Sequence, residues 1–185
     1  MLSHNSLEPV YRPRRAGTPA PSGAVDDPGP MGWVEYPGGV VPIGRPYGAG
    51  GFGFDNEGPR HDALLHPHRL GDRLVTCGEW IEFMADGGYR RPELWLSDGW
   101  YTREREGWDT PLYWRADGDS WRVHTLAGVR PVDPNEPVGH VSFYEADAFA
   151  TWSGHRLPTE FEWEHAAGQQ AVAGTFLAPD PLEGP

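Results

Sequence analysis

Two helix starts, each marked by its own capping residues, lie close together near the C-terminal end of the chain. Ser142 stands three residues before Glu145, and Thr159 stands three residues before Glu162. In such a capping box the hydroxyl accepts a hydrogen bond from a first-turn amide, and the carboxylate accepts one from the amide of the cap residue. Gly154 offers a left-handed stop between the two. The pattern predicts two short helices joined by a tight loop.

A third capping box lies earlier in the chain. Thr76 stands three residues before Glu79, and Gly87 follows at a distance that suits the end of a short helix. A third short helix is therefore predicted here. The apolar residues at helical spacing, expected to form its buried stripe, are Trp80, Phe83 and Met84.

The remaining segments predict short strands and irregular chain. Residues 33–36 and 40–43 are β-prone runs on either side of Pro37-Gly38-Gly39, which is typical of a hairpin, with Pro42 on an edge. Residues 61–74 favour an extended chain. Between residues 89 and 133, Trp residues alternate with Gly, Asp and Pro, which predicts mostly loop held together by aromatic packing.

Composition excludes several functional classes. The formal charge is -12, and all 15 basic residues are Arg, which argues against a nucleic-acid footprint. No apolar run approaches the ~20 residues needed to cross a bilayer, and the first residues lack a signal peptide's apolar core. We therefore expect a cytoplasmic protein without nucleic-acid or membrane partners. Cys77 is the single cysteine, so no internal disulfide is possible.

The second helix region carries a family motif. Its RLPTE and EWE segments resemble the formylglycine-generating-enzyme/sulfatase-modifying-factor domain, and RRPELWLSDGW at residues 90–100 resembles one branch, the ergothioneine-biosynthesis sulfoxide synthases. The resemblance implies an α+β fold similar to C-type lectin-like folds, with short strands, three short helices and much irregular chain. The motif residues, expected to be structural, are Arg156, Leu157, Pro158, Thr159, Glu160, Glu162, Trp163 and Glu164.

The resemblance also predicts the organisation of the chain. Residues 1–31 are expected to be a Pro-rich linker, residues 32–177 the N-terminal part of the formylglycine-generating-type domain, and residues 178–185 a divergent tail. Family members bind Fe(II) through three histidines of an N-terminal helical domain, two of them in an H-x-x-x-H spacing. None of the eight His here has that spacing. The family's C-terminal catalytic half also has no counterpart, so a fragment is expected.

The resemblance implies a reaction for the intact family member. Such enzymes use Fe(II) and O2 to join γ-glutamylcysteine or cysteine to trimethylhistidine (hercynine) and form a sulfoxide. We expect no catalytic and no metal residue in this chain, no activity of the chain alone, and the missing helical iron-binding domain as a partner. Two rival functions stay open, namely a non-catalytic binding module on the same fold and a fragment of a formylglycine-generating oxidase.

Several residues have both a functional and a structural interpretation. Trp95 and Trp100 could hold a trimethylammonium group through cation–π attraction, but core packing is the favoured interpretation. Cys77 is in the first turn of its helix, where the dipole could lower the thiol pKa, yet an inert thiol is favoured. His66 and His68 could be metal ligands, but they lack a clear third partner.

The acidic cluster near the second helix start has a similar pair of interpretations. Glu160, Glu162 and Glu164 suggest catalytic carboxylates, but residues two apart on a helix do not face each other. Capping and the helix dipole explain Glu160 and Glu162. His140 is interpreted as a structural histidine rather than a proton shuttle.

Overall fold

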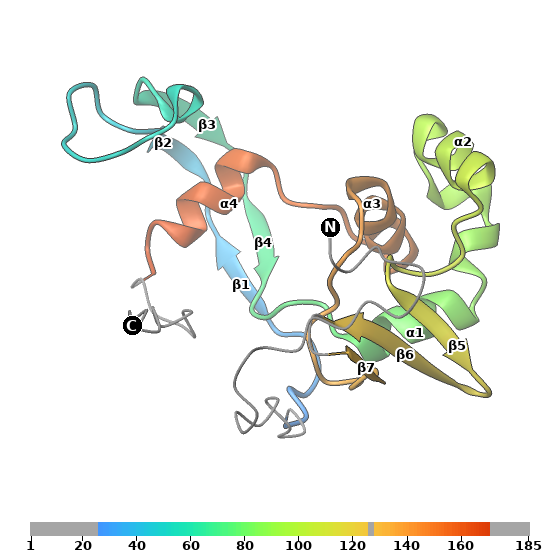
Figure 1. The fold of residues 1–185 in the computed structure, drawn as a ribbon. Helices are drawn as coiled ribbons and strands as arrows, with labels where there is room; N and C mark the ends of the chain where they lie inside the picture. The colour runs from blue at the N-terminus through green and yellow to red at the C-terminus, as the bar shows by residue number, and fades with distance from the viewer. Residues whose placement is uncertain (1–25, 126–127, 171–185) are drawn as a thin grey trace, which may run out of the picture. The chain divides into compact units, whose positions relative to one another are not determined.

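The computed structural model describes residues 26–125 and 128–170 (Figure 1). Within them, residues 26–34, 71–125 and 128–157 form a first compact unit, and residues 35–70 and 158–170 form a second. The short helices, short strands and irregular chain confirm the predicted α+β class. The expected linker up to residue 25 and the expected tail lie outside the described residues. Nowhere in these ranges is a helix long and apolar enough to span a bilayer.

The first unit contains three helices, which are α1 (Cys77–Ala85), α2 (Ser97–Glu106) and α3 (Phe143–Trp152). The predicted capping boxes begin α1 and α3. The Glu79 amide donates to the Thr76 hydroxyl while the Thr76 amide donates to the Glu79 carboxylate. Ser142 and Glu145 make the same exchange. Two 3-10 turns, η3 (Gly88–Arg90) and η4 (Pro92–Leu94), follow α1.

Helix α2 corrects the sequence prediction. This segment was expected to be mostly loop, and three helices were expected where the described residues form four. The N-cap of α2 is Leu96, whose side chain makes no capping hydrogen bond, so the start lacks the signal that marks the other helices. The end does carry a signal, because Gly107 adopts a left-handed conformation with φ of 69°.

Aromatic side chains build the main core of the first unit. Trp80 stacks on Phe149 with ring centroids 5.0 Å apart and planes 8° apart, which joins α1 to α3. Phe83 lies against both Phe149 and Tyr89. The buried residues of this cluster are Trp80, Phe83, Tyr89, Leu94, Trp95, Ala148 and Phe149. Most of the predicted stripe on α1 is therefore buried, while Met84 lies at the edge of the cluster.

An antiparallel three-stranded sheet completes the first unit. Strands β5 (Trp114–Asp117), β6 (Ser120–Thr125) and β7 (Gly128–Pro131) pair in sequence order, so each strand lies beside its chain neighbour. Trp114 and Val123 face each other across β5 and β6. They form a second small core with Cys77 of α1.

Two strand pairs and one helix make up the rest of the described fold. Strand β1 (Trp33–Tyr36) pairs with β4 (His68–Gly71), and β2 (Gly39–Ile43) pairs antiparallel with β3 (His61–Leu65). A 3-10 turn, η2 (Asp55–Glu57), lies in the loop between β2 and β3, and α4 (Glu160–Ala167) packs against this pair. Val41, Ile43 and Leu65 form a small core.

The predicted hairpin of residues 33–36 with 40–43 is wrong. Gly38 has φ of 76°, and a Cβ added to it would lie 2.5 Å from the Leu65 carbonyl oxygen. The segment Pro37-Gly38-Gly39 thus bends the chain while keeping it against the β3–β4 segment, instead of reversing it. Each predicted strand therefore pairs with a later one.

The Trp80–Phe149 stack predicts a large stability effect. Trp80 is 1% exposed, so Trp80→Ala should leave a cavity and lower the free energy of unfolding by about 3–5 kcal/mol. Trp163→Ala is the matched control, because Trp163 is 60% exposed and its removal should change stability by less than about 0.5 kcal/mol. Urea denaturation followed by circular dichroism measures both, and equal losses would contradict the assignment of the core.

Candidate functional site

Helix α4 carries the family motif and sets the site of the second unit. Its predicted capping box is present, because the Glu162 amide donates to the Thr159 hydroxyl at 3.2 Å and the Thr159 amide donates to Glu162 Oε2 at 2.8 Å. The Glu162 side chain is buried, and its Oε1 lies 3.8 Å from His68 Nδ1. The capping interpretation of Glu162 is confirmed, and both of its carboxylate oxygens face protein groups.

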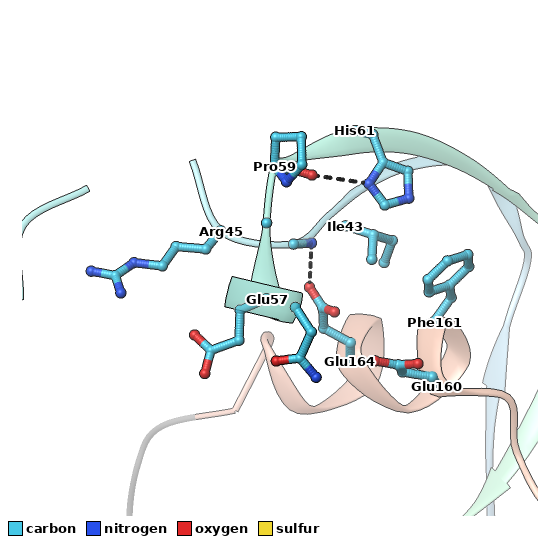
Figure 2. Close-up of a pocket in the computed structure, with 11 residues that line it drawn as sticks. Ile43, Arg45, Glu57, Pro59, His61, Glu160, Phe161 and Glu164 are labelled. Carbon is cyan, nitrogen blue, oxygen red and sulfur yellow. Dashed lines mark hydrogen bonds between the residues drawn. The ribbon is translucent and has the colours of Figure 1, made fainter. Parts of the chain in front are cut away.

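Glu160 and Glu164 lie on a different side of α4 from Glu162. They are four residues apart and therefore share a face of the helix. The Gly44 amide at the end of β2 donates to Glu164 Oε1 at 2.7 Å, as the dashed line in Figure 2 shows. This bond ties α4 to the start of the loop between β2 and β3. Glu160 is exposed in the first turn, where a negative charge suits the helix dipole.

These two carboxylates border a hollow of about 520 Å³. Figure 2 shows Glu160, Phe161 and Glu164 of α4 opposite residues of β2, β3 and their loop. The His61 ring lies edge-on to Phe161 at 5.6 Å, and its Nδ1 is 3.1 Å from the Pro59 carbonyl oxygen. The lining is thus partly aromatic and partly acidic, which suits a ligand that offers positive charge or hydrogen-bond donors beside apolar surface.

A buried imidazole lies elsewhere in the second unit. The His68 ring stacks on Tyr36 with centroids 5.1 Å apart, and its Nδ1 is 2.9 Å from the His66 carbonyl oxygen. His66 itself is exposed, just outside β4. Across residues 26–125 and 128–170, no three side chains of His, Cys, Asp or Glu gather closely enough to hold a metal ion. The described residues therefore do not fit an iron site.

The aromatic candidates lie in the first unit. Trp95 is buried in the main core, and its Nε1 donates to the Gly88 carbonyl oxygen at 2.9 Å. Trp100 is half-buried, with the Arg103 guanidinium carbon 5.3 Å from its ring centroid. Both rings therefore have protein partners, and their role in binding a substrate stays a prediction.

A buried hydrogen bond of the first unit was not predicted. The Tyr89 hydroxyl donates to Glu145 Oε1 at 2.6 Å, and Glu145 is 4% exposed. Burial, followed by the negative charge of Glu145, raises the pKa of Tyr89. The two residues are 56 positions apart, so no local pattern could have linked them. The bond joins η3 to the start of α3.

Other motif residues precede α4 in the chain or lie on it, and His140 belongs to the first unit. Arg156 is exposed, and its Nη1 donates to the Leu157 carbonyl oxygen at 3.0 Å. Leu157 is half-buried, whereas Pro158 and Trp163 are exposed. His140 has φ of 61°, and its ring lies edge-on to Tyr113 at 4.8 Å. None of these residues is among those that line the hollow beside α4.

Comparison with known proteins identifies the family. The model of the sulfatase-modifying factor enzyme 1-like domain matches residues 27–180. The chain belongs to this family. The hercynine oxygenases of Mycolicibacterium smegmatis and Mycobacterium tuberculosis are 40% and 43% identical to it, over 85% and 65% of the chain. The formylglycine-generating enzyme of Streptomyces coelicolor is 33% identical over 87% of the chain.

These matches confirm the resemblance predicted from the RLPTE and RRPELWLSDGW segments. The chain spans about a third of the length of the hercynine oxygenases it matches, since the alignments cover 36% and 28% of these two relatives. The formylglycine-generating enzyme is covered to 58%. The activity of each complete relative therefore depends on a longer polypeptide than the part that aligns with this chain.

Cys77 provides a direct test of the burial of α1. Burial, followed by the negative charge of Glu136, raises the thiol pKa to about 11 from 9.0. At pH 8, two units of pKa leave about 100-fold less thiolate in the folded chain. Iodoacetamide should therefore label the folded chain far more slowly than the urea-unfolded chain. Similar rates in the two states would show that the thiol is accessible.

The same raised pKa predicts a loss of stability in alkali. The folded chain holds the Cys77 proton more tightly than the unfolded chain, so this contribution is complete below pH 9.0 and declines as the pH rises toward about 11. Cys77→Ala should show a smaller decline over that range. Urea midpoints measured from pH 8 to pH 10.5 compare the two proteins, and parallel curves would contradict the prediction.

Proposed function

We propose that the chain supplies part of a hercynine oxygenase, an Fe(II)- and O2-dependent sulfoxide synthase of ergothioneine biosynthesis. The observation that carries this proposal is 40% identity to the Mycolicibacterium smegmatis hercynine oxygenase over 159 residues, which cover 85% of the chain. The substrates would be trimethylhistidine and the thiol of γ-glutamylcysteine or cysteine. Location in the cytoplasm remains part of the proposal.

The proposed reaction balances with O2 alone. The imidazole loses one C–H hydrogen and the thiol loses its S–H hydrogen as the carbon–sulfur bond forms. One oxygen atom of O2 ends on the sulfur as the sulfoxide, and the other leaves as water with those two hydrogens. The two substrates together lose four electrons, which is the number that O2 accepts, so no separate reductant is required.

This chain is proposed to act as a structural part of that enzyme. Its motif residues cap α4 and tie it to the end of β2, which are positioning roles. The described residues do not fit an iron site, so we assign the iron to the rest of the enzyme, including the helical domain expected as a partner. When bound there, Fe(II) would supply the activation of O2. The chain alone is proposed to be inactive.

Two other functions are weaker alternatives. A formylglycine-generating oxidase is supported by 33% identity to the Streptomyces coelicolor enzyme, which is below the identity to the hercynine oxygenases. A non-catalytic binding module on the same fold would need neither iron nor O2. The aromatic and acidic hollow beside α4 is the observation that favours such a module.

A chimera tests the proposal. Residues of this chain replace the 159-residue aligned segment of the Mycolicibacterium smegmatis hercynine oxygenase, and the purified chimera receives Fe(II), O2, trimethylhistidine and γ-glutamylcysteine. We expect the sulfoxide product, measured by mass spectrometry, at more than about a tenth of the parent rate. The 185-residue chain alone should give none.

The matched control is the same replacement with the aligned segment of the Streptomyces coelicolor formylglycine-generating enzyme. It should fold, as judged by circular dichroism, but form no sulfoxide. A folded but inactive chimera of this chain would overturn the proposed function. Conversion of a sulfatase-peptide cysteine to formylglycine by the chain would favour the oxidase alternative instead.

A further inference from the structure

The end of the β2–β3 pair that carries their connecting loop has two neighbouring hollows. The first, beside α4, has a volume of about 520 Å³, and the second has about 480 Å³. They share Arg45, Gly58 and Pro59 as a common wall. We call the two together the acidic groove, and all of its lining belongs to the second unit.

Aromatic rings are exposed along the acidic groove. Tyr47 and Phe54 line the second hollow and are 99% and 65% exposed, and Phe161 lines the first. Phe52, next to them on the same loop, lies edge-on to Phe54 at 4.9 Å. Folded proteins seldom leave several neighbouring rings in water, and such rings are enriched at the centres of protein interfaces.

The loop that carries these rings is held in shape by Arg45. Its Nη2 donates to the carbonyl oxygens of Ala49, Gly50 and Gly51 at 3.0, 2.6 and 2.9 Å. The Arg45 amide also donates to the Glu57 carbonyl oxygen at 2.6 Å, which closes the loop. Because these bonds exist within the chain, the groove has its shape before any partner arrives, and less conformational entropy is lost on binding.

The groove is negatively charged where α4 borders it. Glu57, Glu160 and Glu164 line the first hollow. The Gly44 amide that donates to Glu164 is neutral and leaves its charge in place. Figure 2 shows Arg45 turned away from Glu160 and Glu164, toward its own loop. The complementary partner therefore offers positive charge beside apolar side chains.

Charge also decides between two possible occupants. A second copy of this chain would bring a formal charge of -12 and another acidic groove, so like charges would meet. The rest of the proposed enzyme is a polypeptide of different sequence, and the hercynine oxygenase of Mycolicibacterium smegmatis has nearly two thirds of its length outside the aligned part. A segment of that remainder is the better occupant.

We propose that the acidic groove docks a basic polypeptide segment from the part of the enzyme that this chain does not span. This rests on the proposed function. Lys or Arg side chains of the segment would lie against Glu57, Glu160 and Glu164, while its apolar side chains would cover Tyr47, Phe54 and Phe161. The groove would thereby join this chain to the polypeptide that carries the iron.

Binding of groove variants tests the proposal. The probes are the two parts of the Mycolicibacterium smegmatis hercynine oxygenase outside the aligned segment, expressed separately, and the full 185-residue chain is immobilised. One part should bind, more weakly at higher salt. The double variant Glu57→Gln with Glu160→Gln should bind more weakly, with a dissociation constant raised by about tenfold or more. Tyr47→Ala should also weaken binding, without any change of charge.

The control variants make the same changes on the first unit. Glu82→Gln with Glu104→Gln removes two exposed carboxylates from α1 and α2, and Tyr101→Ala removes a ring that is 62% exposed. These should bind as the unmodified chain does. Circular dichroism confirms that every variant is folded before binding is compared.

Three outcomes would overturn the docking proposal. Equal binding by groove and control variants would place the contact elsewhere. Sedimentation showing a dimer of the chain that only groove variants dissociate would make a second copy the occupant. Failure of both probes to bind, together with an active chimera, would overturn the docking segment but leave the proposed function standing. An inactive chimera with intact groove binding would instead count against the proposed function alone.

Discussion

The second oxygen of each capping carboxylate connects local structure to tertiary structure in this protein. In all three boxes, one oxygen accepts from the amide of the cap residue. The other oxygen faces a residue outside the helix. Glu79 Oε1 accepts from Arg73 at 2.8 Å, Glu145 Oε1 accepts from Tyr89 at 2.6 Å, and Glu162 Oε1 lies 3.8 Å from His68 Nδ1. Each helix start is thereby fixed both along the chain and against a neighbour, and the Arg73 bond lowers the pKa of Glu79.

The capping boxes themselves could be predicted from the sequence. A hydroxyl three residues before a glutamate identified the starts of α1, α3 and α4 because the box is closed within a single turn. The contact between the second carboxylate oxygen and a distant residue could not be predicted, since Tyr89 and Glu145, for example, are 56 residues apart. Helix α2 lacks a capping side chain, so only its C-terminal glycine marked it. The strand pairing failed for a related reason, because Gly38 was interpreted as a turn although its contact with the backbone of Leu65 makes it a bend.

Prediction of the candidate site followed the same division. Helix geometry predicted from the sequence that Glu160, Glu162 and Glu164 do not form one carboxylate cluster, since residues two apart do not face each other. It could not show what the Glu160 and Glu164 side of the helix would meet. That depends on the loop after β2, where Gly44 reaches Glu164 and Arg45 holds the loop carbonyl groups. The Gly44–Glu164 contact joins residues 120 positions apart, and no motif in the sequence connects them.

Capping also determines which carboxylates remain for an outside partner. A glutamate with one oxygen on a cap amide and the other against a buried side chain cannot turn toward a ligand without losing both contacts, and Glu162 is in that position. Glu160 caps nothing and is exposed, and Glu164 gives one oxygen to Gly44 while bordering the hollow. The motif helix therefore has one side committed to its own fold and another that keeps negative charge at an aromatic surface. That asymmetry is the reason that the partner proposed for the acidic groove is basic.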